Sequence, residues 1–160
     1  MTPRQREIAA ESYTACLLAQ AGYDVLVQYS ANQPHYDLVA VKDNRMLPIS
    51  VKGSQDGGWM LAVRYLRAGV SCHAAIDQWL SIQRDDVVYA FVQFMDVLIG
   101  QAPRVFVARP QEIASHMKAQ CFGRGRAYLQ EDYRRDHPHT QYNDKIPSQW
   151  GFSDVRIDAI

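Results

Sequence analysis

Apolar residues recur at helical spacing in some stretches of the chain and at strand spacing in others. Residues 3–21 predict a helix that begins at Thr2 and Pro3, a favourable cap and first position, and that ends at Gly22. Beyond residue 22, stretches with strand spacing are interrupted by stretches with helical spacing. Strands are predicted at residues 23–29, 36–41, 46–51, 59–66, 87–95 and 104–108, and further helices at residues 73–83 and 110–120. This order predicts an α/β fold with a mixed central sheet of about four to five strands flanked by helices.

The last quarter of the chain has a different pattern. From residue 121 onward the sequence is polar and rich in turn residues, so we expect residues 121–160 to form an irregular extension packed on the core. The aromatic residues expected to anchor it are Tyr128, Tyr133, Trp150 and Phe152. A chain of 160 residues can bury one sizeable core, so we expect a single domain over residues 1–160.

Composition narrows the classes of protein. Apolar residues make up 48% and charged residues 21%, which is typical of a folded protein. No apolar run approaches the roughly 18 residues that span a bilayer, and the N-terminus lacks the apolar segment of a signal peptide, so we expect a cytoplasmic protein without a membrane partner. The net charge is zero, although residues 101–140 hold seven Lys/Arg against four Asp/Glu. That excess indicates either a modest basic patch or scattered surface charges.

Two apolar runs around a polar turn predict a hairpin. A turn at residues 43–44 places Asp37 opposite Ser50 and His35 opposite Lys52. Alternate residues share a face and opposed Cβ atoms lie about 5 Å apart, so the four polar side chains form a cluster at the open end. Both faces inward of this cluster are apolar, which is typical of the middle of a covered sheet.

An acid and an amine beside a covered sheet have to be paired, metal-bound or catalytic. The spacing alone is compatible with an ordinary ion pair between Asp37 and Lys52 at the end of a sheet. Pro48 indicates a bulge, and a bulge of one residue would turn Ser50 and Lys52 away from Asp37.

Asp37, followed after twelve residues by Ser50-Val51-Lys52, resembles the motif of the PD-(D/E)xK nuclease superfamily. The chain resembles the archaeal Holliday junction resolvases and intron homing endonucleases of this superfamily, in which an N-terminal helix often carries a further glutamate, here Glu11. The resemblance covers about residues 5–60. It implies a restriction-endonuclease-like core and hydrolysis of DNA phosphodiester bonds with Mg²⁺, or Mn²⁺ in its place.

The resemblance also implies roles for the matching residues. Asp37, the backbone carbonyl of Val51 and, through water, Glu11 would hold the metal, while Lys52 would position the attacking water. Ser50 could only support a water molecule. From the residues alone, Glu11 could equally be a partly exposed glutamate on an irregular helical stripe, where it aligns with apolar residues.

The motif departs from the superfamily at Ser50, which replaces the acid of the acid-x-lysine pair. A neutral hydroxyl is a poorer ligand for Mg²⁺ than a carboxylate is. Asp56, in the following loop, and Asp77, on the next predicted helix, are the candidates for the missing acid.

DNA contact is expected from the loop at residues 53–58 and from basic residues of the C-terminal region. The candidate DNA-binding residues are His35, Gln55, Arg124, Arg126, Arg134 and Arg135. Two strand cuts usually need two active sites, so we expect a homodimer or a higher symmetric assembly.

Three classes of function remain open. The leading prediction is a Mg²⁺-dependent DNA endonuclease. The Ser50 substitution favours a catalytically impaired nuclease-fold module that binds nucleic acid, and the zero net charge favours a protein-interaction domain.

Overall fold

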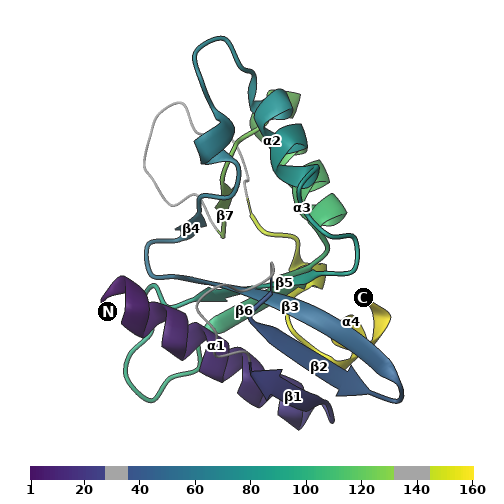
Figure 1. Cartoon of the computed structure of the whole chain (residues 1–160). Coiled ribbons are helices and arrows are strands. Elements are labelled where there is room, and N and C mark those ends of the chain that lie inside the picture. The colour runs from purple at the N-terminus through teal and green to yellow at the C-terminus, as the bar shows by residue number, and fades with distance from the viewer. Residues whose placement is uncertain (28–35, 132–144) are drawn as a thin grey trace.

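The computed structural model describes residues 1–27, 36–131 and 145–160 (Figure 1). Its helices are α1 (Pro3–Gln20), α2 (Cys72–Leu80), α3 (Pro110–Gly123) and α4 (Asp154–Ala159), with short 3₁₀ turns η1 (Val63–Tyr65) and η2 (Ser148–Trp150). Its strands are β1 (Asp24–Val27), β2 (Leu38–Lys42), β3 (Arg45–Ser54), β4 (Gly58–Trp59), β5 (Val88–Gln93), β6 (Arg104–Ala108) and β7 (Leu129–Gln130).

Five strands form one mixed sheet in the order β1-β2-β3-β5-β6. Strands β3 and β5 are parallel, and the other neighbours are antiparallel. The predicted α/β fold with a mixed, helix-flanked sheet is therefore confirmed. The strand predicted at residues 59–66 is wrong: β4 ends at Trp59 because its partner β7 has only two residues, and the chain then enters η1.

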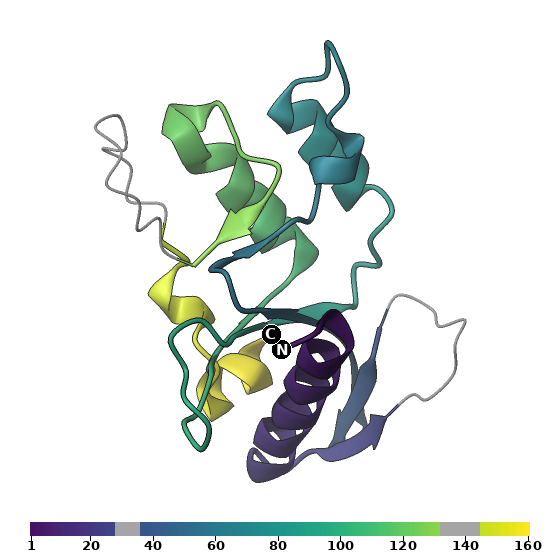
Figure 2. The same ribbon diagram turned by 90° about the vertical axis from the view of Figure 1, so that its left-hand side faces the viewer.

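Helices α1 and α4 cover one face of the sheet, which we call the closed face (Figure 2). Side chains at alternate positions of β2 and β3 point to it and are almost fully buried. Leu18 of α1 and Ile157 of α4 belong to the same apolar cluster. The cluster members from the two strands are Leu38, Ala40, Leu47, Ile49 and Val51.

Helices α2 and α3 and the small β4–β7 sheet pack on the opposite face, over β5 and β6. Phe91 of β5, Ile76 of α2 and Met117 of α3 are completely buried there. The hairpin of β2 and β3 extends beyond this cover, and Met46 on that side is 63% exposed. The expectation that both faces of the hairpin are covered is thus wrong, because α2 and α3 reach only the β5–β6 half of the sheet.

The β2–β3 hairpin has the predicted turn and register. Asp43 and Asn44 have φ values of 49° and 63°, the left-handed conformations of a two-residue type I′ turn. The ladder runs without interruption to the pair Leu38 and Ile49. One further step along this register places Asp37 beside Ser50.

Pro48 does not introduce a bulge. It lies opposite Val39 in regular register. Hydrogen-bonded and non-hydrogen-bonded pairs alternate along an antiparallel ladder, and counting from the turn gives Pro48 a nitrogen that points away from β2. On its other side, pairing with β5 begins only at Ile49. The missing N–H of Pro48 therefore removes no ladder hydrogen bond.

The described part of the C-terminal region packs on the core and includes elements that the sequence pattern did not predict. The indole of Trp150 is 2% exposed, and the N–H of Phe152 donates to the carbonyl of Val105 at 2.9 Å. Ser153 caps the short helix α4. Tyr128 lies beneath the Arg126 guanidinium, and Tyr133 falls outside the described residues. Within the described ranges, none of the helices combines the length and apolarity needed to cross a membrane.

Candidate active site

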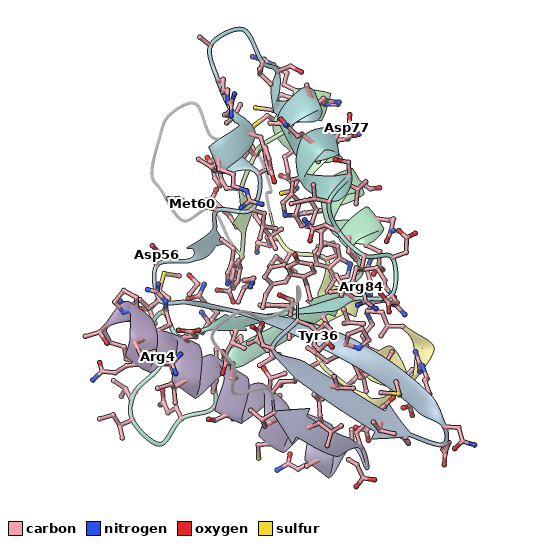
Figure 3. The ribbon with its side chains drawn as sticks, in the orientation of Figure 1. Arg4, Tyr36, Asp56, Met60, Asp77 and Arg84 are labelled. Carbon is pink, nitrogen blue, oxygen red and sulfur yellow. The ribbon has the colours of Figure 1, made fainter. Side chains whose placement is uncertain are left out.

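A cleft of about 850 Å³ opens at the open end of the β2–β3 hairpin. Residues of α1 and of the hairpin line one side, and residues of β4, η1 and α2 line the other. Figure 3 shows Tyr36 on the hairpin side, near Arg84, with Asp56 and Met60 toward the other side. The cleft lies where the cover of α2 over the sheet ends.

Asp37, Ser50 and Lys52 come together at the base of this cleft. The Oδ2 atom of Asp37 accepts the N–H of Val51 at 2.6 Å and lies 4.0 Å from Nζ of Lys52. The hydroxyl of Ser50 is 3.5 Å from the same oxygen, too long for a strong hydrogen bond. All three side chains therefore project from one face of the sheet, as the turn at residues 43–44 predicts.

Asp37 lies at the point where β3 stops pairing with β2 and continues to pair only with β5. Strand β3 pairs with β2 up to Ile49 and continues with β5 up to Ser54, so β2 supplies no backbone acceptor beyond that point. The carboxylate of Asp37 accepts the N–H of Val51 instead, while the N–H of Asp37 donates to the carbonyl of Ile49 at 2.8 Å. Two hydrogen bonds thus fix the acid at the point where the strands separate.

Glu11 reaches the cleft from α1 and lies within electrostatic range of Asp37. Burial raises the pKa of Glu11, and the negative charges of Asp37 and Glu7 raise it further, against the opposing effect of Arg4 and Lys52. Two carboxylates of like charge in one cleft form a site that a cation would stabilise.

Gly53 allows α1 to pack this close to β3. A Cβ atom at this position would lie 3.0 Å from Cβ of Ala10 and from Cγ of Arg6, and 3.1 Å from the carbonyl oxygen of Arg6. Such contacts are tighter than most Cβ contacts in proteins, so a side chain here would push α1 away from β3 by a few tenths of an ångström. Glu11 lies one residue beyond Ala10, so its place at the cleft depends on this packing.

The oxygen donors of the cleft suit a hard cation such as Mg²⁺. Within residues 1–27, 36–131 and 145–160, however, no group of three or more His, Cys, Asp or Glu residues could hold a metal ion. Asp56 lines the cleft and accepts the hydroxyl of Ser54 at 2.8 Å, so it is the nearer of the two candidate replacement acids. Asp77 does not line the cleft and pairs with Lys118 on the surface of α2 and α3, which excludes it (Figure 3).

Three of the predicted DNA-binding residues lie outside the cleft. Gln55 accepts a hydrogen bond from the N-terminal ammonium of Met1 at 3.1 Å and does not line the cleft. Arg126 donates to Sγ of Cys121 and to Oε1 of Gln130, within its own segment. Arg124, also outside the cleft, is exposed at the end of α3. The predictions for His35, Arg134 and Arg135 fall outside the described residues.

Two arginines that the sequence analysis did not select line the cleft instead. Arg6 lies on α1, five residues before Glu11, a spacing that does not put the two side chains on the same helical face, so no local pattern would have selected it. Arg64 belongs to η1, and its guanidinium lies 4.8 Å from the centre of the Tyr65 ring. Its position follows from the 3₁₀ turn that replaces the predicted strand.

A ladder of buried aromatic rings supports the cleft. Trp59 contacts Phe91 at 5.2 Å between ring centres, Phe91 stacks on Tyr89 at 5.7 Å, and Tyr89 contacts Trp79 at 5.8 Å. Burial and the charge of Asp37 raise the pKa of Tyr89 to about 12. Tyr89 therefore remains a neutral hydrogen-bond donor, to Oε1 of Gln83 at 2.6 Å.

No protein-family model matches the chain, and no curated protein matches it in sequence. Among solved structures, the chain is similar to the bacterial homing endonuclease I-Ssp6803I, with 13% sequence identity and a TM-score of 0.45. The similarity covers 87% of this chain and 86% of the endonuclease. At this identity and TM-score, the similarity supports no conclusion about activity.

Proposed function

We propose that the chain is a metal-dependent endonuclease that hydrolyses DNA phosphodiester bonds in the cleft. The observation that supports it is the Asp37–Lys52 pair, which comes from two strands and is aimed into a cleft that also contains the Glu11 carboxylate. The two charged groups are 4.0 Å apart, whereas direct charge-assisted hydrogen bonds measure about 2.8 Å. The ammonium of Lys52, with 43% of its side chain exposed, therefore remains available to a phosphate.

Mg²⁺ or Mn²⁺, when bound, would polarise the phosphate and lower the pKa of a water molecule. Asp37, Glu11 and the carbonyl of Val51 would hold the metal. Lys52 would donate to a phosphoryl oxygen and balance the negative charge that grows there. Arg6 and Arg64, the two arginines that line the cleft, would donate hydrogen bonds to the DNA strand on either side of the scissile phosphate. Two cuts in a duplex need two such sites, and we propose a symmetric homodimer as the assembly.

A second function is favoured by one observation. Ser50 occupies the position of an expected acid, its side chain is buried, and the described cleft residues supply fewer than three clustered ligands. A site with so few ligands would bind a metal ion weakly. The chain would then be a module that binds DNA without cutting it. Cleavage assays separate the two functions.

We expect Asp37→Asn and Lys52→Met each to lower Mg²⁺-dependent or Mn²⁺-dependent cleavage by at least about 100-fold, since each removes a charge that acts on the reacting phosphate. Asparagine retains an oxygen that can accept the N–H of Val51, so the fold should persist. The measurement is cleavage of plain, nicked and branched DNA by the full chain, with thermal unfolding recorded in parallel.

Asp77→Asn and Lys118→Met are matched controls, because they remove the same two charges from a pair outside the cleft. Both controls should cleave like the wild type. Undiminished cleavage by Asp37→Asn or Lys52→Met would refute the assignment. DNA binding by a wild-type chain that cuts none of these substrates with either metal would identify the non-cleaving module.

A further inference from the structure

One wall of the cleft is apolar and open to solvent. Met60 is 81% exposed, Ile82, which follows α2, is 42% exposed, and the partly buried Leu61 lies between β4 and η1; all three line the cleft. We call these three residues the apolar wall. Such exposed apolar side chains are costly in water, and a group of them beside a polar site marks a surface that binds an apolar ligand group.

The apolar wall is anchored to the strand that carries Lys52. Trp59, directly before Met60, is only 5% exposed and donates its indole N–H to the carbonyl of Lys52 at 2.7 Å. Trp79, three residues before Ile82, is 3% exposed and belongs to the same aromatic ladder. The wall is therefore preformed at a fixed position relative to the ammonium that would contact the phosphate.

The charged residues of the cleft do not favour binding of DNA through phosphate contacts alone. Among the described residues, three basic side chains and four acidic side chains line it, a formal balance of −1. Proteins that hold DNA through its phosphates alone use an excess of Lys and Arg. Binding in this cleft therefore needs a second source of free energy, and contact between bases and apolar or aromatic side chains provides one.

We propose that the apolar wall binds a nucleobase that is unpaired and unstacked beside the scissile phosphate. This inference rests on the proposed function and names its substrate class: DNA with unpaired bases at the point of cleavage. Met60, which lines the cleft and is 81% exposed, is an apolar side chain of the kind that separates neighbouring bases. Tyr36, which lines the cleft next to Asp37, offers a ring for the same base. A volume of about 850 Å³ is within the range of pockets that enclose small ligands.

The test measures DNA binding by the full chain with Ca²⁺ in place of Mg²⁺, so that binding is followed without cleavage. Two duplexes of the same sequence contain the fluorescent base aminopurine, which is paired in one and lies in a bulge in the other. We expect the bulged DNA to bind about tenfold more tightly, as stacking of one base provides, and the aminopurine emission to change on binding.

The double variant Met60→Ala/Ile82→Ala should lose this preference while its affinity for paired DNA stays unchanged. Met60→Leu/Ile82→Leu should retain the preference, which separates loss of an apolar surface from loss of the fold. The control Leu98→Ala/Val155→Ala removes two side chains of comparable exposure, 70% and 81%, that do not line the cleft. It should behave as the wild type does.

Equal affinity for the two duplexes, or an unchanged preference in the alanine double variant, would overturn the inference, even where the chain cleaves DNA. A preference that depends on Met60 and Ile82, in a chain that never cleaves with Mg²⁺ or Mn²⁺, would support the base-binding wall and overturn the endonuclease. Failure to bind either duplex would overturn both.

Discussion

The two faces of β3 differ in chemistry although they belong to the same ten residues. Ile49 and Gly53 face α1, where the packing is so tight that a Cβ atom at position 53 would meet atoms of α1 at 3.0–3.1 Å. Ser50 and Lys52, each next to one of these residues, face the cleft. The closed face is complete, whereas the cover of the other face stops at the cleft. A polar site can therefore form within a strand of mainly apolar sequence, at the place where one layer of the fold ends.

The largest contrast is expected between two adjacent residues. Ile49→Ala should lower the free energy of unfolding by about 2–5 kcal/mol, because it leaves a cavity in the closed face. Ser50→Ala should change it by only about 0.5–1.5 kcal/mol, since the substitution removes one hydroxyl that contacts Asp37 at 3.5 Å and hydrogen-bonds Tyr89. Urea denaturation measures both values. Equal losses would show that the two faces are packed alike.

A smaller effect is expected from an added methyl group. Gly53→Ala should cost about 1–3 kcal/mol, because the new Cβ meets α1 at 3.0–3.1 Å. Gly58→Ala is the matched control on the cleft side, where the nearest atom to a new Cβ is 3.4 Å away, an ordinary contact. Thermal unfolding of the two variants compares them. If Gly53→Ala were as stable as Gly58→Ala, the close approach of α1 would not be a constraint.

An acidic residue introduced at position 50 tests whether the cleft binds a metal ion. Ser50→Glu places a carboxylate beside Asp37, so the variant should be less stable than the wild type without metal and should gain more from Mg²⁺. A tenfold tighter site would add about 1.4 kcal/mol of stabilisation at saturating metal. The readout is the shift in unfolding temperature with Mg²⁺ concentration, together with cleavage. An identical Mg²⁺ response in both proteins would argue against a metal site here.

The smallest effect is expected from Glu11, whose pKa is raised by burial and by Asp37. A raised pKa means that the stability associated with protonated Glu11 is complete below the ordinary value of 4.5 and is lost as pH rises through the folded-state value. Glu11→Gln should therefore exceed the wild type in stability at neutral pH, by about 0.5 kcal/mol after solvent screening. This advantage should vanish in acid. Unfolding curves across pH test it, and a pH-independent difference would contradict the electrostatic origin.

Local signals made most of the fold predictable. Thr2 and Pro3 begin α1, and Asp43 and Asn44 form the turn that sets the register of the hairpin. Each of these depends only on a few neighbouring residues, so the sequence was sufficient. Helix α4 was not predicted because its six residues have little stability alone, and the burial of Ile157 in the closed face supports it.

The site was predictable as far as the hairpin register reaches. That register brings Asp37 and Lys52 together, whereas the convergence of Arg6 and Arg64 on the cleft depends on how α1 and η1 pack. Arg126 has the right charge but interacts with its own segment. Counting basic residues along the chain cannot distinguish these cases, because the distinction lies in long-range packing.

The hydrogen bond from the Trp59 indole to the Lys52 carbonyl closes the loop over residues 52–59. A ligand that shifts β3 at Lys52 would therefore also change the surroundings of the fluorescent Trp59 indole. Tryptophan emission is thus expected to change when a ligand occupies the cleft. This signal can be followed in the unlabelled chain, in a titration with DNA or with divalent ions.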